Sequence, residues 1–326
     1  MKATDYFNLN LTQGQLDFVN IDLVSDSELY LNSNMISNSS FKNLKLNGAK
    51  DIASFFENIF NLYKSGERDK TIDSFFNHSS EDNSNHFGLS AKKSQGKGLS
   101  RDELIVLFDK LYATGILSSQ YISNPESILI LAPGFGPDFM SDLLLSILRK
   151  RLVDYSLFQA KKLNIPIEKD IISYGDYWNS SSLQWEELCN RWIKGPDGNP
   201  VILTPKQIVS EEYAYSTGDY IQKFVLTWRQ SYHLDNRTTL VDTKSDKNGN
   251  MVYKKPSKQK IRKYEIDEKF SDNKNKSYAS LMTNENPNLF KQYIDQHSKN
   301  SKVIKDHILS DSDLERITTK HTNILI

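Results

Sequence analysis

Residues 128–163 constrain the fold most, because they join an apolar run, a turn and the strongest helical pattern in the chain. The run, SILILA at 127–132, is bounded by two prolines, and its length favours a buried strand over a helix. A Pro-Gly-Phe-Gly-Pro turn follows at 133–137. Apolar residues then recur along one side of a helix expected over 141–163. We expect this helix to cross the core.

Apolar periodicity predicts further elements on both sides of this segment. Residues 16–35 alternate between apolar and polar, which predicts two short strands around a turn at 25–27. Residues 49–63 carry the stripe of an amphipathic helix. The run PVILTP at 200–205 predicts a second short buried strand. Three tryptophans are spaced by sevens, which in a helix would put them near one edge: Trp178, Trp185 and Trp192.

These elements predict an α/β or α+β fold, with a mixed central sheet flanked by helices. At roughly 100–200 residues per domain, the 326 residues allow one large domain or two modest ones. We expect a main domain over 1–230. A basic linker and a small helical appendage are expected over 231–326.

Cysteine content and hydropathy bear on the compartment. Cys189 is the only cysteine, so neither an intramolecular disulfide nor a cysteine-based zinc cluster can form. No stretch approaches the ~18 apolar residues of a membrane span, and the first ten residues lack the features of a signal peptide. The sequence therefore predicts a cytoplasmic protein with no membrane partner.

Basic residues are concentrated although the 41 basic and 41 acidic side chains cancel. The segment from Lys244 to Lys263 contains eight basic residues and one acid, and Tyr253 and Tyr264 lie in or next to it. Such a run can track a nucleic-acid backbone by releasing counterions, or it can be a solvated face. Two candidate contacts with nucleic acid are Lys254 and Lys255.

A second candidate for anion binding is the loop GLSAKKSQGKG at 88–98. Its glycines let backbone amides turn toward a phosphate, and Lys92, Lys93 and Lys97 supply charge. The alternative is a plain surface loop, which glycine and serine commonly mark.

Two acids follow the glycine-containing turn. Asp138 and Asp142 are candidate ligands of Mg²⁺ or Mn²⁺, since magnesium needs only one or two carboxylates besides water and substrate phosphate. Lys206, which ends the second apolar run, can stabilise developing phosphate charge in metal-assisted hydrolysis. The alternative for the aspartates is structural, because the amides and dipole at a helix N-terminus stabilise acids.

This set resembles the site of PD-(D/E)xK nucleases, in which an acid on one strand meets an acid-x-lysine pair on the next. Thr204 stands two residues before Lys206, so the second acid is absent from that place. The acid-x-lysine spacing does occur at Asp242-Thr243-Lys244. The Lys-Asn-Gly that follows at 247–249, however, is typical of a hairpin or a flexible loop.

Four segments also resemble a largely uncharacterised family of bacterial proteins. They are 16–32, 86–100, 129–156 and 199–209, and they include the acid-rich turn before the long helix and the Pro-Lys that ends the second apolar run. The resemblance implies an association with anti-phage defence.

We therefore expect a defence-associated protein that acts on nucleic acid, with metal-dependent phosphodiester hydrolysis as the leading activity. Asp138 and Asp142 would hold the metal, Lys206 would support the transition state, and the loop lysines would hold flanking phosphates. One alternative is a non-catalytic sensor or adaptor that binds nucleic acid or a partner protein. Another is a subunit that needs a partner enzyme.

Overall fold

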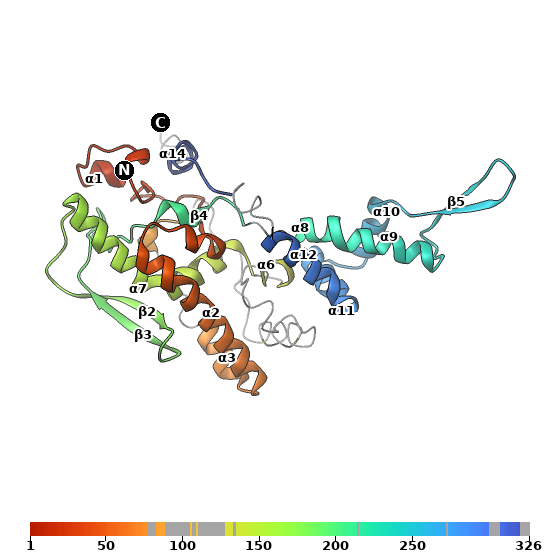
Figure 1. The fold of residues 1–326 in the computed structure, drawn as a ribbon, viewed down its shortest axis with the longest axis horizontal. Helices are drawn as coiled ribbons and strands as arrows, with labels where there is room; N and C mark the ends of the chain where they lie inside the picture. Colours follow the sequence, from red (N-terminus) through yellow and green to blue (C-terminus); the bar gives the residue numbers. More distant parts are fainter. Residues whose placement is uncertain are drawn as a thin grey trace.

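A computed structural model describes residues 1–76, 83–88, 105, 109, 128–132, 135–213, 215–271, 273–299 and 307–319. The chain forms a rounded body, from which an arm of helices projects and ends in a two-stranded ribbon (Figure 1). The last described helix, α14 (Asp311–Thr319), returns to the body and lies beside the N-terminus.

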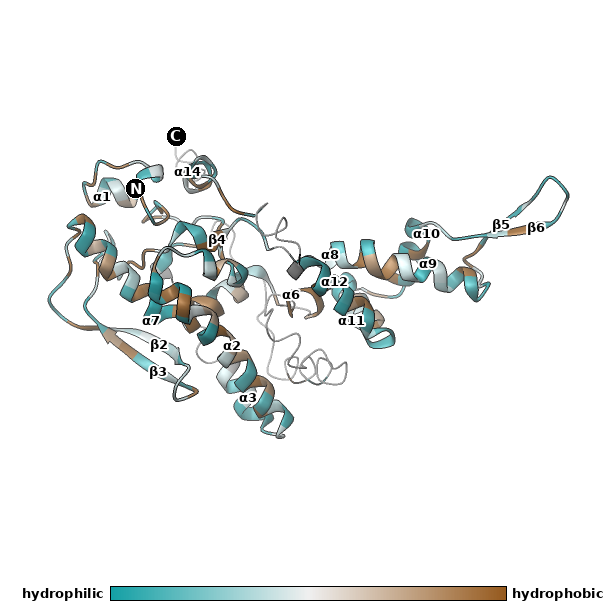
Figure 2. Cartoon of the chain, in the orientation of Figure 1, coloured by the Kyte–Doolittle hydropathy of each residue, from teal (hydrophilic) through white to brown (hydrophobic). Residues whose placement is uncertain are grey.

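Two long helices form the centre of the body. α2 (Lys42–Lys64) is followed by α3 (Arg68–Phe76), and α7 (Pro137–Leu163) begins with proline in its first turn. α7 ends at Asn164, whose φ of 56° gives the left-handed C-cap that asparagine tolerates. The expected helices over 49–63 and 141–163 are confirmed. Figure 2 shows hydrophobic residues along α7, whose first half is buried on nearly all sides, so it crosses the core.

Smaller elements tie the start of the chain to the body. α1 (Ala3–Tyr6) precedes 3-10 turns at Gln13–Gln15 (η1), Ser33–Asn38 (η2), Asn83–Asn85 (η3) and Lys206–Ile208 (η5). The Gln13 amide donates to the Phe18 carbonyl at 2.8 Å and its oxygen accepts from the Asn20 amide at 2.8 Å. These bonds fix an N-terminal segment that has little regular structure of its own.

The strands of the described part form three separate two-stranded antiparallel sheets. β1 (Tyr30–Leu31) pairs with β4 (Val209–Ser210), β2 (Ile172–Asn179) with β3 (Gln184–Asn190), and β5 (Asp242–Ser245) with β6 (Met251–Lys254). The α+β class and the helical C-terminal region are confirmed. The expected mixed central sheet is not formed by the described residues.

The apolar run that was expected to be a strand is instead helix α6 (Ile128–Leu131). Its carbonyl groups find partners outside a sheet: the Thr217 hydroxyl donates to the Ile130 oxygen at 2.9 Å, and the Lys276 ammonium to the Ala132 oxygen at 3.1 Å. A short apolar run is compatible with a buried strand or a buried helix. Here the Thr217 and Lys276 side chains supply the hydrogen-bond donors that a neighbouring strand would otherwise supply.

The other expected strands form only in part. Residues 201–204 are buried and form no regular ladder. Single bridges are formed at Pro200 and Pro205, whose missing N–H groups limit pairing. Within 16–35, the regular pairing is that of β1, beside isolated bridges at Phe18, Asp22 and Ser27.

The tryptophans lie in a hairpin and the segment after it, not on a helix. Trp178 of β2 stands opposite Trp185 of β3, with ring centroids 5.7 Å apart. Both rings pack edge-on against Phe55 of α2, and the Trp178 indole donates to the Ser54 hydroxyl at 2.9 Å. The spacing of seven reflects the hairpin register rather than a helical turn.

The arm is built from helices that include two π-helical turns. α8 (Thr217–Tyr220), η6 (Ile221–Val225) and α9 (Leu226–Asp235) are continuous, as are α10 (Lys258–Arg262) and η7 (Lys263–Asp267). α11 (Lys274–Glu285) and α12 (Pro287–Lys299) complete it. The boundary expected at residue 230 falls inside α9. In the structure, the arm begins earlier, at α8. Among the described residues, no helix combines the length and apolar character needed to span a membrane.

Candidate functional site

Asp138 lies half-buried in the first turn of α7, close to β1. Its Oδ1 is enclosed and accepts no hydrogen bond within the described part of the chain. Burial raises the pKa of this carboxyl group. Burial, together with the charges of Asp138, Glu28 and Glu212, also raises the pKa of Tyr30 to about 12. Asp138 is therefore a carboxylate in an environment that disfavours its charge, a common property of functional acids.

Asp142 follows one turn later on the same helix and is also half-buried. Residues four apart share a helix face, so α7 directs the two aspartates to one side, as a metal site would require. Between them, the Ser141 hydroxyl accepts from the Leu31 amide at 3.1 Å and fixes the helix start against β1. The described residues contain no group of three or more His, Cys, Asp or Glu side chains placed to hold a metal ion.

Lys206 is engaged elsewhere. Its ammonium group lies 2.7 Å from Oδ1 of Asp311 on α14 and donates to the Gln13 carbonyl at 3.4 Å. Within the described part, neither a hydrogen bond nor an ion pair joins it to Asp138 or Asp142. The structure brings together the two aspartates of the expected triad, whereas the lysine fastens the C-terminal helix to the body.

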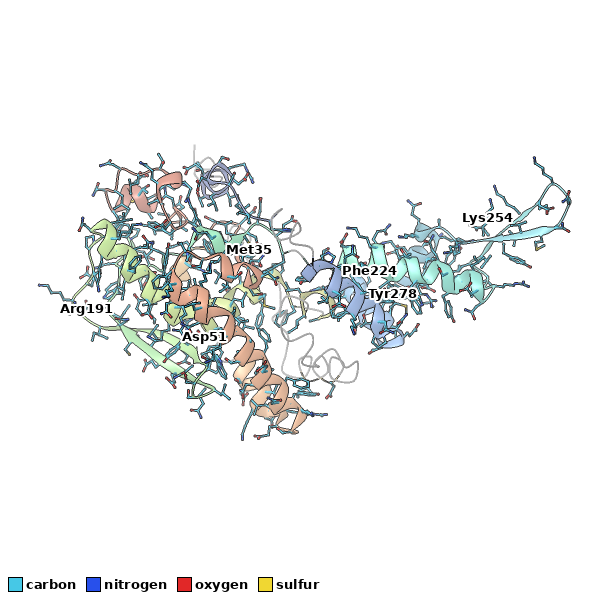
Figure 3. All side chains as sticks on the ribbon, viewed as in Figure 1. Met35, Asp51, Arg191, Phe224, Lys254 and Tyr278 are labelled. Carbon is cyan, nitrogen blue, oxygen red and sulfur yellow. The ribbon has the colours of Figure 1, made fainter. Side chains whose placement is uncertain are left out.

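The loop lysines Lys92, Lys93 and Lys97 lie outside the described residues. The basic run is described, and its first part forms the hairpin β5–β6, one of the two structures of which the Lys-Asn-Gly signal is typical. We call residues 242–255 the basic ribbon. All eight strand residues are exposed, so the basic ribbon packs neither face on the core. Figure 2 shows it as hydrophilic except for a stretch of β6, and Figure 3 shows Lys254 projecting far from the body.

The register gives the basic ribbon two different faces. Asp242 pairs with Lys254 and Lys244 with Val252, so these side chains share one face. The other face carries Thr243 opposite Tyr253 and Ser245 opposite Met251. Lys244 and Lys254 thus stand close together on the same exposed surface.

The acids of the basic ribbon are held within the fold. Asp242 lies 2.7 Å from the ammonium of Lys260 on α10. Asp246 accepts from the amides of Asn250 and Asn248 in the turn, at 2.8 Å each, and these bonds hold its pKa below the usual value. In the described part, Lys244, Lys247 and Lys254 form no ion pair. These three lysines are therefore not paired with the acids of the basic ribbon.

The arm also contains a buried polar cluster that no local sequence pattern predicts. The Arg229 guanidinium donates to both oxygens of Glu265, with Nε 2.9 Å from Oε2, and the Tyr278 hydroxyl donates to Oε2. His233 Nε2 lies 3.0 Å from Oε1. Arg229 and His233 are four apart on α9, but Glu265 comes from η7, and sequence alone cannot bring it there.

A family model described as "Domain of unknown function (DUF8370)" matches residues 8–216. The match covers more than half of the chain. The chain belongs to the DUF8370 family. The DUF8370 match includes Asp138, Asp142 and Lys206 and ends one residue before α8, so the arm with its basic ribbon lies beyond it. No curated protein and no solved structure matches the chain.

Proposed function

We propose that this chain binds nucleic acid through the basic ribbon at the end of its arm. The observation that carries the proposal is the face on which Lys244 and Lys254 stand side by side, exposed and without ion pairs in the described structure. The neighbouring acids are engaged by Lys260 and by turn amides. Lysines in this state can release the counterions of a phosphate backbone when they bind it.

The position of the basic ribbon supports the same proposal. An isolated two-stranded hairpin is marginally stable in water, and this one packs neither face on the core. A projecting ribbon is also narrow enough to approach a nucleic-acid backbone without interference from the body. The ribbon is elongated and lies at the tip of the arm, which suits a binding element rather than a structural one (Figure 1).

This function fits a sensor or adaptor that binds nucleic acid and presents it to a partner protein. The resemblance to defence-associated bacterial proteins supports such a role in anti-phage defence. The arm and the DUF8370 domain would then divide the work: the arm would bind nucleic acid, and the domain would carry the activity or the partner surface.

Replacing both lysines of the charged face tests the proposal. In the double variant Lys244→Gln/Lys254→Gln, we expect affinity for a labelled oligonucleotide to fall. The slope of log K against log salt should lose about 1.4–1.8, because each phosphate contact contributes about 0.7–0.9. Fluorescence anisotropy between 50 and 300 mM salt would measure both. The matched control is Lys45→Gln/Lys50→Gln, on the exposed side of α2. If the ribbon variant binds with the same affinity and the same salt slope as this control, the proposal is wrong.

Metal-dependent nuclease activity is the second candidate, and the enclosed Asp138 carboxylate beside Asp142 favours it. We expect cleavage of DNA or RNA in Mg²⁺ or Mn²⁺ that chelator stops and that Asp138→Asn abolishes. Because burial disfavours the Asp138 charge, Asp138→Asn should leave the melting temperature unchanged or raise it. Asp313→Asn, on α14, is the control and should cleave normally. Wild-type protein without cleavage, under every metal and substrate, would exclude this candidate.

A further inference from the structure

Two tyrosines near the base of the basic ribbon are exposed, and each has a cation over its ring. Tyr232 on α9 is 40% exposed, with the Arg229 guanidinium 4.2 Å from its ring centroid. Tyr253 on β6 is 37% exposed, with the Arg237 guanidinium 4.9 Å from its ring centroid. Both rings therefore belong to the surface rather than to the core of the arm.

Short contacts place these two tyrosines in one region. The Lys255 ammonium donates to the Ser231 hydroxyl at 2.9 Å, and these residues are two and one positions from Tyr253 and Tyr232. The Gln230 amide also donates to the Pro256 carbonyl at 2.7 Å. The end of β6 is thereby fastened to α9, and the aromatic and basic side chains of the two elements share one end of the arm.

We infer that this part of the arm binds single-stranded nucleic acid, with bases stacked on Tyr232 and Tyr253 and phosphates on the lysines of the basic ribbon. The inference rests on the proposed function and names its substrate class. Aromatic rings beside a positively charged path are the combination that single strands require, because every base has a flat face to stack. A guanidinium on one side of a ring strengthens such a site through its charge.

The two faces of the basic ribbon favour a single strand over a duplex. Tyr253 projects from the face opposite to that of Lys244 and Lys254. A flexible strand can pass around the ribbon edge, so that its phosphates meet the lysines while its bases reach the tyrosine. A duplex keeps its bases paired and stacked inside, and a base must be extruded before a side chain can stack on its face.

Binding of matched oligonucleotides to tyrosine variants tests the inference. The probes are an oligothymidylate, an oligouridylate of equal length, and a duplex of the same length. We expect both single strands to bind more tightly than the duplex. Tyr253→Leu and Tyr232→Leu should each weaken single-strand binding about 5- to 150-fold, the range for loss of one stacked base. Neither change removes a charge, so the salt slope should stay at the wild-type value.

Two control variants make the outcomes distinct. Tyr253→Phe keeps the ring and should bind single strands like the wild type. Phe158→Leu, on an exposed ring of α7, should also have no effect. Equal binding by the leucine variants and the wild type, or tighter binding of the duplex, overturns the inference and leaves nucleic-acid binding by the lysines intact. Absence of binding to every probe overturns both.

Discussion

Replacing Arg151 with methionine should lower the free energy of unfolding by about 3 kcal/mol, the lower end of the cost of removing one partner of a buried ion pair, because the arginine is partly exposed while its carboxylate partner is enclosed. Arg151 of α7 donates to Asp51 of α2 with Nε 2.8 Å from Oδ2, and the Asp51 side chain is only 4% exposed. The Ser180 hydroxyl completes the set at 2.7 Å from Oδ1. The variant leaves the carboxylate charge enclosed, with the serine as its main donor. Urea unfolding followed by tryptophan fluorescence would measure the loss.

Two further variants separate the ion pair from general packing. Arg191→Met removes an arginine that projects outward from the same body and should change stability by less than about 0.5 kcal/mol (Figure 3). Asp51→Leu combined with Arg151→Met removes both charges together, and it should be less destabilising than Arg151→Met alone. A double variant that is less stable than the single one would contradict the role given to the enclosed charge.

Helices of the body could be predicted because their signal is local. The apolar stripe of α2 follows the 3.6-residue period, whereas α7 is a long, largely apolar stretch whose first half is buried on nearly all sides; each signal lies within one stretch of sequence. Strand pairing is not local. Residues 128–131 are helical, and two side chains from far away in the chain donate to carbonyls of the apolar run: Thr217 to Ile130 and Lys276 to Ala132. The tryptophan spacing was ambiguous for the same reason: seven residues fit a helix, or two strands and a turn.

The candidate site was predictable to a similar extent. Asp138 and Asp142 come together because one helix carries both. Lys206 was assigned to them from a supposed pair of adjacent strands, whereas its partner, Asp311, lies on a helix more than a hundred residues later. The basic ribbon was anticipated through charge and turn residues. Tyr232 was not, since an aromatic residue in a helical pattern is usually a core residue and its exposure depends on the arm's packing.

The second large effect is expected in the arm, at the carboxylate of Glu265. Glu265→Gln should destabilise the arm by up to about 3 kcal/mol, because the buried Arg229 charge then keeps only the half-exposed Glu285 carboxylate, 3.9 Å from its Nη1. Burial also lowers the pKa of His233, so this histidine is neutral at pH 7 and adds no second positive charge beside Arg229. Hydrogen exchange would show faster exchange of amides over 217–299 and little change in α2. Glu268→Gln, exposed on the turn after η7, is the matched control.

The pH dependence of the same carboxylate gives an independent measure. Burial alone would raise the pKa of Glu265, but hydrogen bonds from Arg229 and Tyr278, with the arginine charge, outweigh it and hold the pKa below its ordinary value of 4.5. The contribution of Glu265 to stability is therefore complete above that value and is lost as the pH falls through the lower pKa of the folded state. The difference in free energy of unfolding between the wild type and Glu265→Gln should therefore shrink below pH 4.5. A difference that stays constant down to acid unfolding would mean that the glutamate acts through shape rather than charge.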